Sequence, residues 1–109
     1  MHPVRVSIFM NEGDRWHGLP LHIQLLKALE KNGIAGATVI RGVAGYTRSE
    51  GICTTSLVDV GRKLPLVLEF IDEERHIEQV LPELEEMVGN RLITTSDIAV
   101  RHGGAFKPN

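Results

Sequence analysis

The sequence contains little cysteine, few aromatic residues and no long hydrophobic run. Cys53 is the single cysteine among 109 residues, which excludes an internal disulfide bond and predicts a reducing, cytoplasmic location. No apolar stretch approaches the roughly 18 residues of a membrane-spanning helix, so we expect no membrane insertion. The first ten residues contain Arg5 and Ser7 and lack the pattern of a secretory signal, so none is expected.

An excess of charge of one sign is also absent. The chain contains twelve Lys and Arg residues and fourteen Asp and Glu residues, which gives a formal net charge of −2 at pH 7. Binding to nucleic acid usually needs a clear positive excess, so we expect no nucleic-acid partner. The content of 42% apolar and 24% charged residues is typical of a folded domain. The length predicts a single domain over residues 1–109, with a core over about 4–101 and a tail over 102–109.

The spacing of apolar residues predicts six regular elements. Strands are expected over residues 4–10, 37–44, 64–71 and 92–101, and helices over 20–31 and 73–88. Asp72 is expected to cap the second helix, and Pro82 to kink it or delay its start. Residues 11–18 are a polar connection, and residues 45–63 are a long loop without periodicity between the second and third strands.

The β-α-β-β-α-β order is the split βαβ pattern of ferredoxin-like folds. The fold class is therefore α+β, a sandwich of a four-stranded antiparallel or mixed sheet with two helices on one face. The third strand is nevertheless apolar on both sides, with Leu66 and Leu68 facing one way and Val67 and Ile71 the other. We expect the bare face to be buried against another copy of the chain. A few unimportant exposed aliphatic residues are the alternative interpretation.

The start of the long loop supplies the first group of candidate ligand-binding residues. Loops of this length are usually functional or disordered. Arginine can bind an anion bidentately, glycine permits unusual backbone geometry, and tyrosine can stack on a base. The group comprises Arg41, Gly42, Gly45, Tyr46 and Arg48. The alternative is a plain hairpin extension whose base is solvated, with Arg41 in an ion pair between subunits.

The connection after the first strand supplies the second group, which comprises Arg15, Trp16 and His17. It joins the end of a strand to the beginning of a helix, a place where anions and polar ligands commonly bind. Trp16, the only tryptophan, is expected to be a stacking platform or an interface anchor. Glu12 and Asp14 in the same connection are expected to make local caps and salt bridges.

Several stretches resemble those that enter and leave the T-loop of PII signal-transduction proteins. They are residues 33–39, the motif Gly45-Tyr46-Thr47-Arg48 and residues 64–69. Over about residues 4–101, the chain more closely resembles a bacterial and archaeal family of PII-like proteins with no assigned function. The marks of that family are Glu12-Gly13-Asp14, Gly18-Leu19-Pro20-Leu21, residues 36–42, Leu64-Pro65 and residues 77–94.

The resemblance implies a ferredoxin-like homotrimer that holds a small anionic ligand in clefts between subunits. An adenine nucleotide would act there as a regulatory ligand, and no cofactor is expected. Loop 45–63 would act as the effector loop on a partner such as an enzyme, a transcription factor or a membrane transporter. PII proteins hold phosphates with a glycine- and lysine-rich turn before the fourth strand. The stretch that we match to that turn, residues 94–97, has neither residue type, and Asp97 would repel phosphate.

Two other functions on the same fold remain open. Acylphosphatases are small ferredoxin-like hydrolases that use an Arg and an Asn near the first loop, and Asn11 and Arg15 are present here. CutA-like metal-tolerance proteins are also trimeric and ferredoxin-like. No pair among the five histidines has the spacing of a metal site, and Cys53 stands alone in the loop. The sequence therefore predicts no metal ligand and no catalytic residue.

Overall fold

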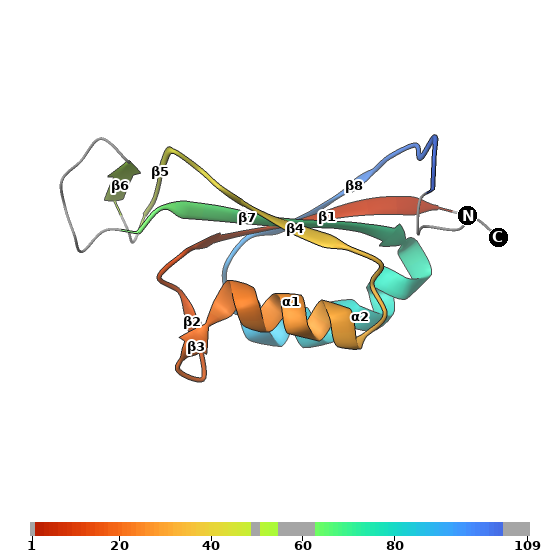
Figure 1. The fold of residues 1–109 in the computed structure, drawn as a ribbon, viewed down its shortest axis with the longest axis horizontal. Helices are drawn as coiled ribbons and strands as arrows, with labels where there is room; N and C mark the ends of the chain where they lie inside the picture. The colour runs from red at the N-terminus through yellow and green to blue at the C-terminus, as the bar shows by residue number, and fades with distance from the viewer. Residues whose placement is uncertain (1, 49–50, 55–62, 104–109) are drawn as a thin grey trace.

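A four-stranded sheet with two helices on one face forms the body of the protein (Figure 1). The computed structural model describes residues 2–48, 51–54 and 63–103. The sheet contains β1 (Pro3–Asn11), β4 (Ala37–Arg41), β7 (Pro65–Glu73) and β8 (Ile93–Asp97) in the order β4-β7-β1-β8. Every pairing is antiparallel. Helices α1 (Leu21–Lys31) and α2 (Glu74–Val88) lie side by side beneath it. The predicted α+β, ferredoxin-like class is confirmed.

The core lies between the sheet and the helices. Alternate residues of the central strands β1 and β7 face the helices, because side chains alternate along a strand. Each helix contributes a stripe at helical spacing. The main buried side chains are Val4, Val6, Ile8, Met10, Leu66, Leu68 and Phe70 from the sheet and Leu21, Leu25, Leu29, Ile77, Val80, Leu84, Met87 and Val88 from the helices. Each large one contributes about 1.5–3 kcal/mol by burial.

The helix ends follow from local residues. Helix α1 begins after Pro20 and ends at Asn32-Gly33, where Gly33 adopts a φ of 80° that suits glycine. Helix α2 begins at Glu74 and continues through Pro82, so the predicted late start is wrong. Asp72 is not the cap either. Its carboxylate accepts a hydrogen bond from the Glu73 N–H at 2.7 Å, one residue before the helix.

His76 links the two helices at this end. Its Nδ1 lies 3.1 Å from the Asp72 carboxylate, and its Nε2 lies 2.8 Å from the Asn32 carbonyl oxygen at the end of α1. The imidazole therefore spans the end of β7, the first turn of α2 and the end of α1. Such a contact fixes how the helices sit on the sheet.

Two small hairpins lie where the sequence predicts irregular chain. Strands β2 (Arg15–Trp16) and β3 (Leu19–Pro20) pair around His17 and Gly18, which both have positive φ, as in a type I′ turn. Strands β5 (Ala44–Thr47) and β6 (Gly51–Thr54) form the second hairpin inside the predicted long loop. A two- to four-residue strand is too short to show a period, so the pattern missed both.

Several predicted boundaries are also wrong. The predicted strand 37–44 divides at Gly42, whose N–H bonds to the Pro65 carbonyl at 2.8 Å, and the last strand ends at Asp97 rather than at residue 101. The third strand runs from Pro65 to Glu73. Residues 55–62 of the predicted loop and 104–109 of the predicted tail lie outside the described residues. Within the described chain, neither helix has the length and apolar character needed to cross a membrane.

Leu68 tests the position of the core. Its side chain is fully buried at the centre of β7. The substitution Leu68→Ala is expected to lower the free energy of unfolding by about 2–5 kcal/mol, because it leaves a cavity. Urea denaturation at a fixed protein concentration measures this. Leu92→Ala removes the same atoms at an exposed position and should change stability little; equal losses in both variants would contradict the assigned core.

Candidate functional site

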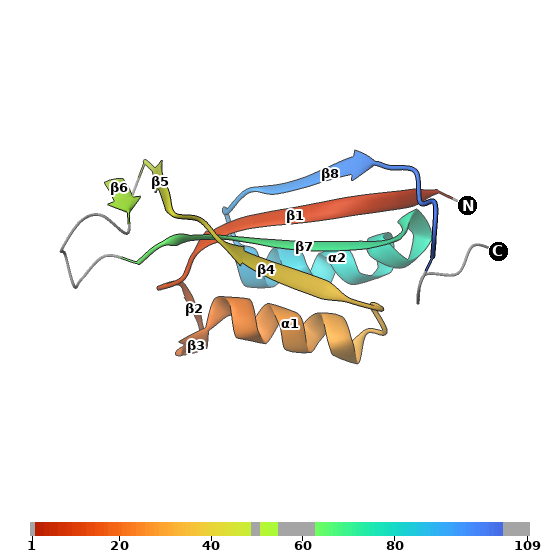
Figure 2. The same cartoon turned by 45° about the horizontal axis from the view of Figure 1, so that its top comes forward.

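The candidate site lies at the end of the sheet from which the β5–β6 hairpin projects. There β1 ends, β4 ends and β7 begins, as Figure 2 shows. Glu12, just after β1, contacts the chain on both sides of the loop. Its Oε1 accepts a hydrogen bond from the Leu64 N–H at 2.8 Å, and its Oε2 lies 3.4 Å from the Arg41 guanidinium. The Glu12 N–H in turn donates to the Leu64 carbonyl at 3.0 Å. One residue therefore ties both limbs of the loop to β1.

The neighbouring side chains reinforce this tie. The Asn11 amide donates to the Lys63 carbonyl at 3.0 Å and accepts from the Gly13 N–H at 2.8 Å. A side chain at Gly13 would bring a Cβ to 3.0 Å from the Lys63 Cγ, so any other residue would displace the Lys63 side chain by a few tenths of an ångström. We refer to Asn11, Glu12, Gly13, Lys63 and Leu64 as the loop clasp.

The two predicted glycines pack against a proline. A Cβ at Gly42 or at Gly45 would lie 3.0 Å from the Pro65 Cγ. The Gly42 N–H is already bonded to the Pro65 carbonyl. These residues therefore allow the limbs of the loop to meet closely, and the Gly42 N–H is not available to an anion in this conformation.

The charged and aromatic residues of the first predicted group extend outward from the clasp. The Arg41 side chain is 63% exposed, and in the described chain its guanidinium contacts the Glu12 carboxylate. Tyr46 on β5 and Arg48 just beyond it are both exposed. Arg41 thus presents most of its N–H donors to solvent beside the base of the loop.

The second predicted group lies elsewhere. The β2–β3 hairpin is on the helix side of the sheet, next to the beginning of α1 (Figure 1). Arg15 donates to the Gly18 carbonyl at 3.0 Å within its own hairpin, and Trp16 stacks on His17 with 4.1 Å between ring centroids. Trp16 also packs against the core. Within one chain, these residues and the loop clasp do not form one site.

Arg91 is the functional candidate that the sequence reasoning missed. It follows α2, and its Nε donates to the Asp14 carboxylate at 2.7 Å. The turn before the fourth strand is therefore residues 89–92, with Gly89 and the cation Arg91. The match of residues 94–97 to a phosphate-binding turn was wrong, because those residues lie in β8. The Gly-Asn-Arg sequence directly after a helix was the available signal.

Glu12 and Asp14 both form salt bridges, but the partners, Arg41 and Arg91, are distant in the chain rather than local as expected. The local contact of Asp14 is the hydrogen bond that its carboxylate accepts from the Asn11 N–H at 2.9 Å. Two carboxylates in one short connection thus hold one arginine from β4 and one from the turn between α2 and β8. Cys53 is buried on β6, with its Sγ 3.7 Å from the Gly51 carbonyl oxygen.

A family model matches residues 3–100 of the chain. The chain belongs to the DUF190 family, which is described as "Uncharacterized ACR". A UPF0166 protein of Aquifex aeolicus is 38% identical over 95 residues, which are 87% of this chain and 90% of that protein. A UPF0166 protein of Methanocaldococcus jannaschii is 33% identical over 103 residues, 94% of each chain.

Solved structures with the same fold include PII-like proteins. CPII of Thiomonas intermedia, bound to ADP and bicarbonate, aligns with a TM-score of 0.68 and 17% identity over 98% of this chain and 96% of CPII. A putative PII-like signalling protein of Thermus thermophilus aligns with a TM-score of 0.64 and 19% identity over 96% of each chain. CutA1 of a Shewanella species also reaches a TM-score of 0.64, with 10% identity over 94% of this chain and 87% of CutA1. At these identities the likeness shows the fold, and the predicted resemblance to an uncharacterised PII-like family is confirmed.

The electrostatics of the clasp can be tested through Glu12. The hydrogen bond from the Leu64 N–H lowers the pKa of the Glu12 carboxyl below the ordinary 4.5. Partial burial raises this pKa, while the charges of Arg41 and Lys63 lower it further. Because the folded-state pKa is depressed, the stabilisation by Glu12 is complete above about pH 4.5. It is lost as the pH falls through the lowered value.

The substitution Glu12→Ala is expected to open the clasp at neutral pH. The Leu64 N–H loses a charge-assisted hydrogen bond worth about 1.5–3 kcal/mol, so its amide should exchange with solvent at least tenfold faster. Hydrogen exchange read by NMR measures this rate. Glu30→Ala changes an exposed carboxylate on α1 and should leave the rate unchanged. An unaltered Leu64 rate in Glu12→Ala would contradict the clasp.

Proposed function

We propose that this protein is a PII-like regulatory protein that binds a small anion, most simply an adenine nucleotide, beside the loop clasp. It acts as a homotrimer, and the ligand lies in a cleft between subunits. Loop 45–63 is the effector element that a partner protein reads. The protein works in the cytoplasm and needs no cofactor of its own.

The observation that carries this proposal is the double attachment of Glu12. One carboxylate holds both the limb that enters the loop, through Arg41, and the limb that leaves it, through Leu64. An anion that binds the exposed guanidinium of Arg41 competes with the 3.4 Å contact to Glu12. Binding therefore changes the balance between two states of the loop, as a regulatory ligand must.

The ligand class is supported by the bound groups of a protein with the same fold. CPII is bound to ADP and bicarbonate, which are both anions. The fold alone does not separate this function from that of CutA1, because the two TM-scores are similar. The exposed guanidinium of Arg41 at the base of the loop favours an anion over a metal cation. The acylphosphatase alternative is weakened, because both polar atoms of the Asn11 amide are engaged within the clasp.

The β5–β6 hairpin supports the role of the loop. It projects beyond the sheet and exposes Tyr46 and Ile52. Exposed aromatic and aliphatic side chains on such an arm suit recognition by a protein partner. An enzyme, a transcription factor or a membrane transporter would all present a surface for this contact.

Ligand binding is tested by thermal denaturation of the purified protein with ADP, AMP and bicarbonate. A ligand present at a hundred times its dissociation constant should stabilise the folded state by about 2.7 kcal/mol. Arg41→Ala should weaken binding at least tenfold, because a charged contact worth about 1.5–3 kcal/mol is lost. Arg75→Ala removes an exposed arginine on α2 and is the matched control.

Two results would contradict the proposal. One is that none of the three anions stabilises the folded protein. The other is equal affinity of the wild type and Arg41→Ala for an anion that binds. Copper binding at one ion per chain in the same preparation would instead support the metal-tolerance function.

A further inference from the structure

The face of the sheet opposite the helices carries no covering element in the described chain (Figure 1). Its residues alternate with the buried ones along each strand, and the strand register fixes their neighbours. We call this set the open face: Arg5, Ser7, Phe9, Thr38, Ile40, Val67, Glu69, Ile71, Thr94 and Ser96. Three of its apolar members share one row across the strands, and the two charged members lie in other rows.

The apolar row crosses three strands. Phe9 pairs with Val67, and Val67 pairs with Ile40 on the other side. Phe9 and Ile40 are exposed, and so is Ile71 further along β7. Apolar side chains that are neighbours across three strands, unlike scattered ones, indicate a surface that another molecule covers.

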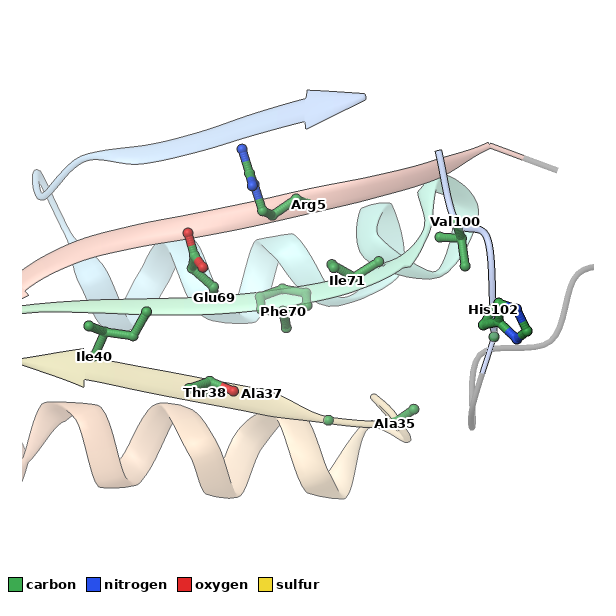
Figure 3. A pocket seen from close by; sticks show the side chains of 12 residues that line it. Arg5, Ala35, Ala37, Thr38, Ile40, Glu69, Phe70, Ile71, Val100 and His102 are labelled. Carbon is green, nitrogen blue, oxygen red and sulfur yellow. The ribbon is translucent and has the colours of Figure 1, made fainter. Parts of the chain in front are cut away.

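The two charged members lie in neighbouring rows. Arg5 pairs with Ile71, and Ser7 pairs with Glu69, so the cation and the anion come from adjacent strands. Glu69 accepts a hydrogen bond from the Ser7 hydroxyl at 3.3 Å. Within the described chain, the Arg5 side chain makes no hydrogen bond or ion pair. Figure 3 shows both side chains on the same side of the sheet.

A groove of about 690 Å³ runs along this surface. Ile40, Ile71 and Thr38 form its floor, and Val100 and His102 of the segment after β8 stand at one end (Figure 3). Its floor is mainly apolar, while Arg5 and Glu69 supply one charge of each sign. One cation and one anion on the same face allow that face to place opposite charges against a second copy of the chain.

We propose that a second copy of this chain covers the open face, and that Arg5 of one subunit forms an ion pair with Glu69 of the next. This inference rests on the self-association in the proposed function and adds the contact that sets the register. In a ring of three, each subunit places Arg5 against one neighbour and Glu69 against the other, so every Arg5 and every Glu69 in the ring has a partner. The apolar row supplies the buried contact area between subunits, and the charge pair selects one orientation of one subunit against the next.

Charge reversal tests the pair. Arg5→Glu makes both charges of the open face negative, and Glu69→Arg makes both positive. Each variant should dissociate at least tenfold more readily than the wild type in size-exclusion chromatography with light scattering at micromolar concentration. The double variant carries both reversals and should regain the wild-type mass. Circular dichroism checks folding, and the milder Arg5→Gln and Glu69→Gln replace any reversal that does not fold.

Mixing the two single variants separates a contact between subunits from one within a chain. Each chain of such a mixture carries two like charges on its open face, so no chain holds an internal pair of opposite charges. Opposite charges meet only where an Arg5→Glu chain contacts a Glu69→Arg chain. In a ring of three, two of the three interfaces then carry opposite charges, so the mixture should assemble more than either variant alone. Arg75→Glu and Glu30→Arg make the same changes on the helices and should keep the wild-type mass.

Each contradictory result has a distinct meaning. Wild-type protein at a single chain mass would overturn self-association and this inference together. Assembly of both single variants at the wild-type mass would overturn the Arg5–Glu69 pair and leave self-association in place. Dissociated single variants that neither the double variant nor the mixture restores would show that the open face matters without this pairing, which also overturns the inference.

Discussion

The whole structure depends on one packing constraint: two helices cover a single face of a four-stranded sheet. The helix side of β1 and β7 is closed by a continuous apolar core. The other side of the same strands still carries Phe9, Val67 and Ile71. Apolar residues on both sides of the sheet are the reason that we propose a second copy of the chain on the open face, because hydrophobic burial is the main favourable contribution to association.

The same two strands connect the open face with the candidate ligand site. β1 carries Arg5 and leads directly into Glu12, while β7 carries Glu69 and begins beside Leu64. The subunit contact that we propose on these strands and the ligand contact that we propose at their end would thus act on common rigid elements. In the proposed trimer, such sharing would give a physical route by which a ligand at one loop affects the neighbouring subunits. Asp14 extends this route to α2 through its ion pair with Arg91.

The sequence predicted those features that have a period, and it failed where contacts are distant or elements are short. The strands around Val6 and Leu68 and the helices around Leu25 and Leu84 repeat over nine to fifteen residues, so their order and fold class followed. Hairpins of two- to four-residue strands repeat too little to detect. The bonds from Glu12 to Leu64 and from Asp14 to Arg91 join residues far apart in the chain, which no local pattern reveals.

Hydroxyl-radical footprinting of the wild-type protein tests most directly whether the open face is covered. Ile40 on that face and Leu19 on the β2–β3 hairpin are both 51% exposed in the single chain, and both are aliphatic. The account predicts that at micromolar concentration Ile40 is oxidised much more slowly than Leu19, and that the difference shrinks as the protein is diluted. Equal oxidation of the two side chains at every concentration would contradict it.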